Sequence, residues 1–278
     1  MRRSQRIAAI TKILVERPHH VFSLSDFAEQ FSAAKSTISE DLTLIRQTFH
    51  ELRVGRVETI SGAAGGVRYI PCLSGRQLWQ RVDALCTKLA EPKRILPGGF
   101  IYLNDLAASP AALAEIGEIF AVRFAPEEPQ YVVTIETAGI PIALMTARSL
   151  NVPLVVARRS SRPTEGSVLT VNYESGSSRR LETMSLGRRD LPAGSRVLLM
   201  DDFMRAGGTL RGLTNLMGEF DCTVVGKAVL IETLEPQKKQ IQDHISLIQV
   251  EDVDEEHRRL RVQPSRWIEQ QRDVDDLV

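Results

Sequence analysis

Three stretches near the start of the chain carry apolar residues at helical spacing. Residues three, four and seven positions apart share one face of an α-helix, so each stretch predicts an amphipathic helix. Pro18 ends the first helix, and Ser23 followed by Asp26 is typical of the N-terminus of the second. The apolar positions are Ile7, Ile10 and Leu14; Leu24, Phe27, Ala28 and Phe31; and Ile38, Leu42, Ile45 and Phe49.

Two β-prone runs follow these helices, at Val57–Ile60 and Val67–Ile70. The connection between them contains Gly62, Gly65 and Gly66, which favours a hairpin. Three helices with a short second-to-third connection, followed by a hairpin, are typical of a winged helix-turn-helix domain. We assign this domain to residues 1–72.

Polar and basic residues of this domain are placed to contact DNA. The third helix opens with short or flexible donors of the kind that read base edges in a major groove. Arginines elsewhere in the domain are expected to lie along phosphates, where they position a protein without reading sequence. Glu40 and Asp41 would have to point away from phosphates or accept a hydrogen bond from cytosine. The expected DNA contacts are Lys35, Ser36, Thr37 and Ser39, with Arg2, Arg3 and Arg68 and, less directly, Arg6, Arg53 and Arg56. The alternative is a small helical domain used for dimerisation or as a lid.

The pattern changes after residue 72. A helix with Leu78, Val82, Leu85 and Leu89 on one stripe comes first, and it either packs into a core, joins the domains or forms a dimer interface. Helical and apolar β-like runs then alternate, which predicts an α/β domain over residues 73–278 with a parallel sheet covered by helices on both faces. The expected elements are helices at 110–124, 141–150 and 207–220 and strands at 131–137, 153–158, 196–202 and 223–233. Residues 167–186 form two β-like runs around a Gly/Ser-rich loop near Gly176, which we expect to cross one edge of the sheet.

The composition and charge are those expected of a soluble globular protein. The chain has 278 residues, 43% of them hydrophobic, and 35 basic residues balance 35 acidic ones. Residues 1–72 carry a small basic excess, which is weak support for a polyanionic partner. The three cysteines form no CxxC pair, and the first residues lack a cleavage site and an uninterrupted apolar stretch. We therefore expect reduced thiols, no zinc, no membrane span and a cytoplasmic location.

The sharpest chemical motif is VLLMDDFMRAGGT, Val197 to Thr209. Four apolar residues predict a buried strand, after which Asp201 and Asp202 can accept from the two hydroxyls of a ribose or face its Mg²⁺ ion. The glycines and the following helix N-terminus offer free N–H groups to a 5-phosphate. Residues 137–139 offer backbone N–H groups to a pyrophosphate, which Arg158 or Arg159 would neutralise. The expected ligand contacts are Asp201, Asp202, Phe203, Met204, Arg205, Ala206, Gly207, Gly208 and Thr209, with Thr137, Ala138, Gly139, Arg158 and Tyr102.

This motif resembles the phosphoribosyl pyrophosphate (PRPP) site of type I phosphoribosyltransferases. Together with KSTISEDL and TEGSVLTVNYESGSSRRLETMSL, it makes residues 1 to about 265 similar to the bacterial purine operon repressors. The resemblance implies a homodimeric repressor of purine-synthesis genes that binds operator DNA, and in which PRPP, with Mg²⁺, acts as inducer. It implies a phosphoribosyltransferase fold used as a sensor and not as an enzyme.

Two positions depart from that family. Ala138 stands where a lysine is usual, which leaves pyrophosphate to the backbone and Arg158, and Arg205 replaces another lysine. Two alternatives stay open: an active purine phosphoribosyltransferase with a regulatory domain, and a sensor of guanosine tetraphosphate at the same pocket. In the second, Tyr102 and Phe203 would stack on the base. Charge on Arg158, Arg159, Arg179, Arg180 and Arg205 would also allow PRPP to compete directly with DNA.

Overall fold

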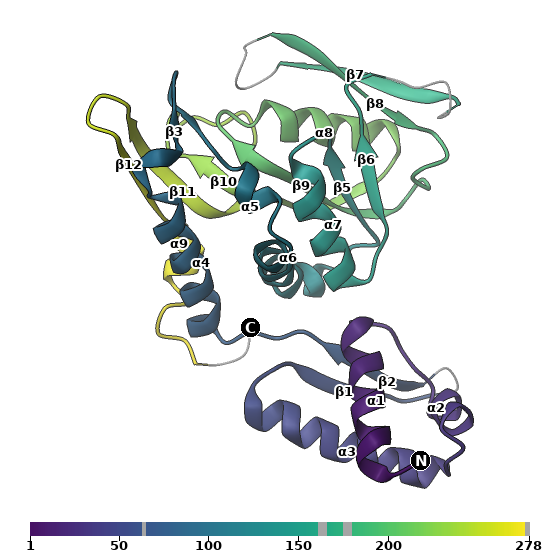
Figure 1. Ribbon diagram of the computed structural model, residues 1–278. Coiled ribbons are helices and arrows are strands. Elements are labelled where there is room, and N and C mark those ends of the chain that lie inside the picture. Colours follow the sequence, from purple (N-terminus) through teal and green to yellow (C-terminus); the bar gives the residue numbers. More distant parts are fainter. Residues whose placement is uncertain (63–64, 161–165, 175–179, 276–278) are drawn as a thin grey trace.

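The computed structural model describes residues 1–62, 65–160, 166–174 and 180–275. It has an N-terminal part, residues 1–70, joined by a short extended segment to a larger α/β part (Figure 1). Gly176 and Arg179 lie outside the described residues. Within the described residues, no helix is both long enough and apolar enough to span a lipid bilayer.

The N-terminal part has the predicted order of three helices and a hairpin. Its core contains the apolar side chains expected from helical spacing, among them Ile10, Leu14, Phe27, Ile38 and Phe49. The Ser23 hydroxyl accepts from the N–H of Asp26 at 3.1 Å, so this N-cap prediction is confirmed. The elements are α1 (Arg3–Glu16), α2 (Leu24–Gln30), α3 (Lys35–Leu52), β1 (Arg56–Ile60) and β2 (Gly66–Ile70).

A six-stranded sheet forms the centre of the larger part, with the order β12-β11-β10-β9-β5-β6. Neighbouring strands are parallel except β12, which runs antiparallel to β11. The predicted parallel α/β sheet is therefore confirmed, with one antiparallel edge added. Its strands are β5 (Tyr131–Ile135), β6 (Leu154–Ala157), β9 (Arg196–Met204), β10 (Thr223–Thr233), β11 (Ile245–Asp254) and β12 (Arg259–Pro264).

Helices cover both faces of this sheet. Alternate residues of the central strands point to opposite faces, so Val132 and Leu198 pack against α6 (Pro110–Phe124) and α7 (Gly139–Leu150), while Val133 and Leu199 pack on the other side against α8 (Gly208–Glu219). The apolar stripe predicted here lies on α4 (Gly75–Leu89) and is buried in the first of these cores. Of the three alternatives for this helix, packing into a core is therefore the one observed. Short elements complete this part: η1 (Pro92–Arg94), β3 (Ile95–Leu96), β4 (Phe100–Ile101), α5 (Asn104–Ala107), η2 (Ala125–Glu127) and α9 (Arg266–Glu269).

The excursion predicted over one edge is a two-stranded antiparallel hairpin, β7 (Val168–Glu174) and β8 (Leu181–Gly187). It covers α8 beside the edge strand β6, which β8 joins through a bridge between Arg158 and Ser185 (Figure 1). Gly212 permits this packing, because a Cβ there would fall 2.7 Å from the Met184 methyl group. The hairpin therefore lies over the helix that follows the acidic motif.

Three boundaries near the motif differ from the predicted ones. Helix α7 begins at Gly139 and not at Pro141, because proline is tolerated in the first helical turn, where N–H groups have no partner within the helix. Helix α8 begins one residue after Gly207, whose φ of +86° is left-handed. Strand β9 continues to Met204 because β10 runs beside it that far, although its pairing with β5 ends at Met200.

Candidate functional site

The start of α3 presents the donors proposed to read DNA. Lys35, Ser36 and Ser39 are exposed and Thr37 is half-buried, while Ile38 points into the core between them. Ala34 precedes the helix and offers no side-chain cap, so the N-terminal N–H groups of α3 are open to an acceptor. This end of α3 can therefore donate to a nucleic acid.

The arginines of this part have different surroundings. Arg2 and Arg3 are exposed at the start of α1. Arg6 is buried, and its Nε donates to Asp41 Oδ2 at 2.5 Å, so its expected place along phosphates is wrong. Asp41 has no exposed surface and also accepts from Arg3, at 3.0 Å. Of the two alternatives that the sequence left for this carboxylate, the structure shows the one in which it points inward, away from the surface.

Three further arginines of this part lie on the β1–β2 hairpin or just before it. Arg68 on β2 donates two hydrogen bonds to Glu58, at 3.2 and 3.0 Å, and Arg56 pairs with the same carboxylate at 2.9 Å. Arg53 ends α3 in the left-handed region and is exposed. Arg68 keeps about a third of its side chain exposed, so it reaches the surface while its guanidinium is shared with Glu58.

Asp201 and Asp202 lie where β9 has passed the end of β5. Asp201 is 7% exposed, and its Oδ1 accepts from the N–H of Asp202 at 3.0 Å. Burial, and then the neighbouring charge of Asp202, raises the pKa of the Asp201 carboxyl well above its ordinary value. Within the described residues, no three His, Cys, Asp or Glu side chains converge to hold a metal ion by themselves.

A cavity of about 350 Å³ opens beside these carboxylates. The residues after β9 wrap around it into the N-terminus of α8, where Gly207 is held in a left-handed turn. A helix N-terminus with a glycine turn favours an anion, because its N–H groups point outward with the positive end of the helix dipole. The sequence-predicted residues that line the cavity are Thr137, Ala138, Asp201, Asp202, Phe203, Met204, Arg205, Gly207, Gly208 and Thr209.

The opposite wall is the turn into α7. Thr137 and Ala138 are exposed there, and Gly139 is buried with room for no side chain: a Cβ would lie 2.7 Å from Thr134 Oγ1 and 3.2 Å from Asp201 Oδ1. Glycine thus lets the start of α7 approach the acidic pair. Ala206 and Gly139 belong to the loops that form the cavity without being lining residues, and the Met204 side chain also packs into the core.

Of the two neighbouring arginines expected at the pyrophosphate, Arg159 lines this cavity and Arg158 does not. Consecutive residues of an extended chain point to opposite sides. Arg158 does not line the cavity and donates to the carboxylate of Glu136, which does, at 3.3 Å, whereas the Arg159 guanidinium pairs with Glu182 of β8. The Tyr173 hydroxyl donates to the same Glu182 at 2.8 Å, and burial, followed by this hydrogen bond, raises the pKa of Tyr173. The emphasis on Arg158 is therefore corrected in favour of its neighbour.

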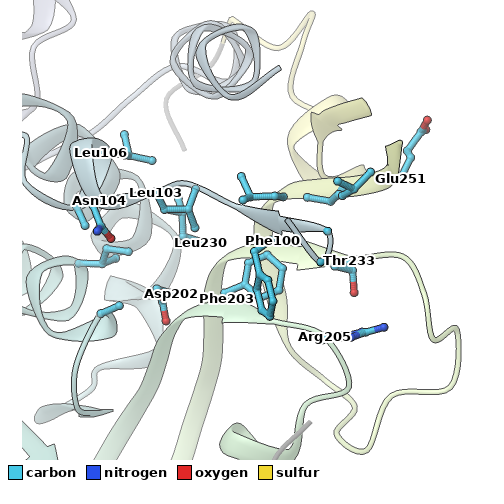
Figure 2. A pocket seen from close by; sticks show the side chains of 18 of the residues that line it. Phe100, Leu103, Asn104, Leu106, Asp202, Phe203, Arg205, Leu230, Thr233 and Glu251 are labelled. Atoms are coloured by element: carbon cyan, nitrogen blue, oxygen red, sulfur yellow. The ribbon is translucent and has the colours of Figure 1, made fainter. Parts of the chain in front are cut away.

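A second cavity of about 590 Å³ adjoins the first, and Ala138, Asp202, Phe203 and Arg205 line both. Phe100 and Phe203 both line it, together with Leu103, Leu106 and Leu230 (Figure 2). Tyr102 is not among its lining residues. Strand β4 ends at Ile101, and Tyr102 instead pairs its backbone with Arg94. Phe100, two residues earlier in the same GGFIY run, is the aromatic that sequence reasoning missed.

The segment between β10 and β11 also contacts this site without a sequence motif to reveal it. Lys239 Nζ donates to the carbonyl of Arg205 at 2.6 Å, and the N–H of Gln240 donates to the carbonyl of Ala206 at 2.7 Å. These residues support the loop Arg205–Thr209 from outside the cavity.

Comparisons with known proteins agree with this two-part organisation. Residues 2–71 match the family model of the bacterial purine repressor N-terminal domain, and residues 103–265 match that of the phosphoribosyl transferase domain. The adenine phosphoribosyltransferase of Rhodothermus marinus is similar in structure, with a TM-score of 0.52 and 24% identity over 61% of this chain and 99% of that one. This likeness shows the fold of the larger part.

Similarity to two regulators extends over nearly the whole chain. It is 42% identical to the purine biosynthesis transcriptional repressor PurR of Bacillus subtilis, over 96% of this chain and 94% of that protein. It is 40% identical to the purine biosynthesis transcriptional activator PurR of Lactococcus lactis, over 95% and 97%. The chain therefore belongs to the bacterial purine repressor family of transcriptional regulators.

Proposed function

We propose that this protein represses genes of purine synthesis and senses PRPP, which binds as inducer at the Asp201–Asp202 site. One observation carries the proposal: an acidic pair, with Asp201 buried and Asp202 half-buried, lies in the same cavity as a helix N-terminus reached through a left-handed glycine. Carboxylates accept from the ribose hydroxyls while the helix N–H groups donate to the 5-phosphate. A phosphorylated sugar needs both the carboxylates and the helix N–H groups in one cavity, whereas a simple anion needs only the N–H groups.

The pyrophosphate of PRPP would lie at the turn into α7. The backbone of residues 137–139 and the Arg159 guanidinium are its donors, and Ala138 contributes no charge. The donor set fits a magnesium complex whose ligands come mainly from phosphate oxygens and water, with Asp201 and Asp202 nearby. Mg²⁺ would neutralise part of the pyrophosphate charge there.

The regulator would act on DNA as a homodimer. Two winged helices related by a two-fold axis read paired half-sites, with Lys35, Ser36, Thr37 and Ser39 at base edges and Arg2, Arg3 and Arg68 at phosphates. Repression is the direction we propose, with the B. subtilis relative as its support; the L. lactis relative is an activator. Reporter expression from a purine promoter with and without the gene separates the two directions.

Calorimetric titration with Mg-PRPP tests the ligand. Asp201→Ala with Asp202→Ala should reduce affinity by at least a hundredfold, since charge-assisted hydrogen bonds contribute about 1.5–3 kcal/mol each. The control is Glu115→Ala with Glu219→Ala, which removes two exposed carboxylates from α6 and α8 and should leave affinity unchanged. Equal affinity of the acidic-pair variant and the wild type would reject the site.

Two alternative functions share these residues. Guanosine tetraphosphate would place its base in the 590 Å³ cavity between Phe100 and Phe203, and Phe100→Ala should weaken it without affecting PRPP. An active phosphoribosyltransferase is favoured by the match of residues 103–265 to that domain. We expect no nucleotide from PRPP with adenine, guanine, hypoxanthine or xanthine, and base-dependent release of pyrophosphate would establish the enzyme instead.

A further inference from the structure

The segment Leu234–His244 connects β10 to β11 and lies against the loop Arg205–Thr209. Lys239 is half-buried there, and its ammonium group donates to two backbone carbonyls, that of Arg205 at 2.6 Å and that of Thr233 at 2.5 Å. The next residue, Gln240, donates its N–H to the carbonyl of Ala206 at 2.7 Å. Two consecutive carbonyls of the loop are therefore held by two consecutive residues of this segment.

Holding these carbonyls also sets the direction of two N–H groups. In a trans peptide the C=O and the N–H point to opposite sides of the chain. The peptides that follow Arg205 and Ala206 are trans, so the N–H groups of Ala206 and Gly207 point away from Lys239 and Gln240. The 350 Å³ cavity is lined by Arg205, Gly207 and Gly208 and not by the supporting segment. Lys239 and Gln240 thus fix two successive peptides from behind the loop, and Gly207, which follows them, lines the cavity.

The supporting segment is itself fixed at its far end. Ile241 is buried, and its Cγ2 lies 2.8 Å from the position that a Cβ on Gly207 would take. Glu232, 8% exposed, accepts from Ser246 at 2.7 Å and lies 2.7 Å from His244 Nε2. The segment consequently cannot retreat from the loop without breaking buried contacts.

We propose that Lys239 is a positioning residue for the 5-phosphate: by holding the carbonyl of Arg205, it turns the loop N–H groups to the phosphate. This inference rests on the proposed PRPP function and assigns a residue outside the motif to it. Lys239 does not line the cavity, so it acts through the loop. Its contribution is limited to the phosphate end of the ligand, because the pyrophosphate end lies at the turn into α7.

The test compares two fragments of the ligand in the full chain, ribose 5-phosphate and Mg-pyrophosphate, alongside PRPP. Lys239→Met retains length and removes the donor, and it should weaken PRPP and ribose 5-phosphate about tenfold or more, the loss expected for a hydrogen bond to a charged group. Mg-pyrophosphate affinity should stay unchanged. Lys239→Arg restores a cationic donor and should recover most of the affinity.

Lys238→Met is the matched control, because Lys238 is exposed on the neighbouring position and the substitution changes charge equally. It should bind all three ligands like the wild type. Equal binding of ribose 5-phosphate by Lys239→Met, or an equal loss for both fragments, would overturn the positioning role. If the wild type binds neither PRPP nor ribose 5-phosphate, the proposed function falls, and this inference with it.

Discussion

Asp41 is the residue whose change should separate the two parts of the molecule most sharply. Its carboxylate has no exposed surface and accepts from Arg6 at 2.5 Å and Arg3 at 3.0 Å, which ties α1 to α3. Asp41→Asn retains the shape and leaves the Arg6 guanidinium, 9% exposed, without a counter-charge. Breaking a buried pair in this way costs about 3–5 kcal/mol.

That cost is large for a part of about 70 residues. Domains are stable by about 5–15 kcal/mol, and small ones lie at the low end of this range. We therefore expect Asp41→Asn to unfold the N-terminal part at much lower urea concentration and to abolish operator binding. PRPP binding should persist, because the ligand site lies entirely in the larger part.

Two spectroscopic signals distinguish the unfolding of the N-terminal part from that of the larger part. Both tryptophans, Trp79 and Trp267, belong to the larger part, so fluorescence follows that part alone, whereas far-ultraviolet circular dichroism follows helices of both. Asp41→Asn should move the dichroism transition of the N-terminal part to lower urea concentration and leave the fluorescence transition of the larger part unchanged. Glu40→Gln is the control: Glu40 is exposed and lies 3.9 Å from Arg3, and such surface pairs contribute about 0–1 kcal/mol. Coincident urea midpoints for Asp41→Asn and wild type would refute the reasoning.

Three further predictions concern the ligand site. PRPP should lower operator affinity by about 5- to 150-fold and then reach a plateau if the coupling is allosteric, whereas an apparent dissociation constant that rises without limit indicates competition. Gly207→Ala should weaken ribose 5-phosphate binding, because the φ of Gly207 is +86° and an added Cβ would lie only 2.8 Å from Ile241 Cγ2. Gly218→Ala is the control, since an added Cβ there meets no atom within 4 Å, and it should leave this binding unchanged. The hydrogen bonds to Glu232 outweigh its burial and lower its pKa to about 2, below the ordinary 4.5. Its stabilising effect is therefore full above pH 4.5 and lost as pH falls toward 2, so Glu232→Gln should reduce the urea midpoint more at pH 7 than at pH 3.

Local contacts explain why the N-terminal part could be predicted from sequence. Its three helices and hairpin follow one another with short connections, and Ser23 caps α2 through residues only three positions away. Asp41 is different, because no periodicity tells whether an acidic residue on a helix meets a buried arginine on another. The sequence argument allowed Asp41 either to point away from phosphates or to accept from cytosine, and its burial against Arg6 of α1 corresponds to the first of these.

Some residues of the ligand site could likewise be predicted from the sequence, and others could not. Val197–Thr209 could be interpreted directly, since a buried strand, an acidic pair and a glycine turn are contiguous. Whether Arg158 or Arg159 enters the cavity depends on how β6 meets β8, which the sequence leaves open. Lys239 lies 34 positions beyond Arg205, in a segment without a motif, so only the tertiary arrangement brings it to the loop.

The two adjoining cavities constrain how any two ligands could act on this protein. Ala138, Asp202, Phe203 and Arg205 line both, so a sugar phosphate placed on the acidic pair occupies their shared wall whether or not a base fills the larger cavity. A sugar diphosphate without a base would leave the space between Phe100 and Phe203 open, and a phosphorylated nucleoside would fill it. The two ligand classes would consequently exclude each other. If only one of them releases DNA, the regulator would respond to their concentration ratio and not to either concentration alone.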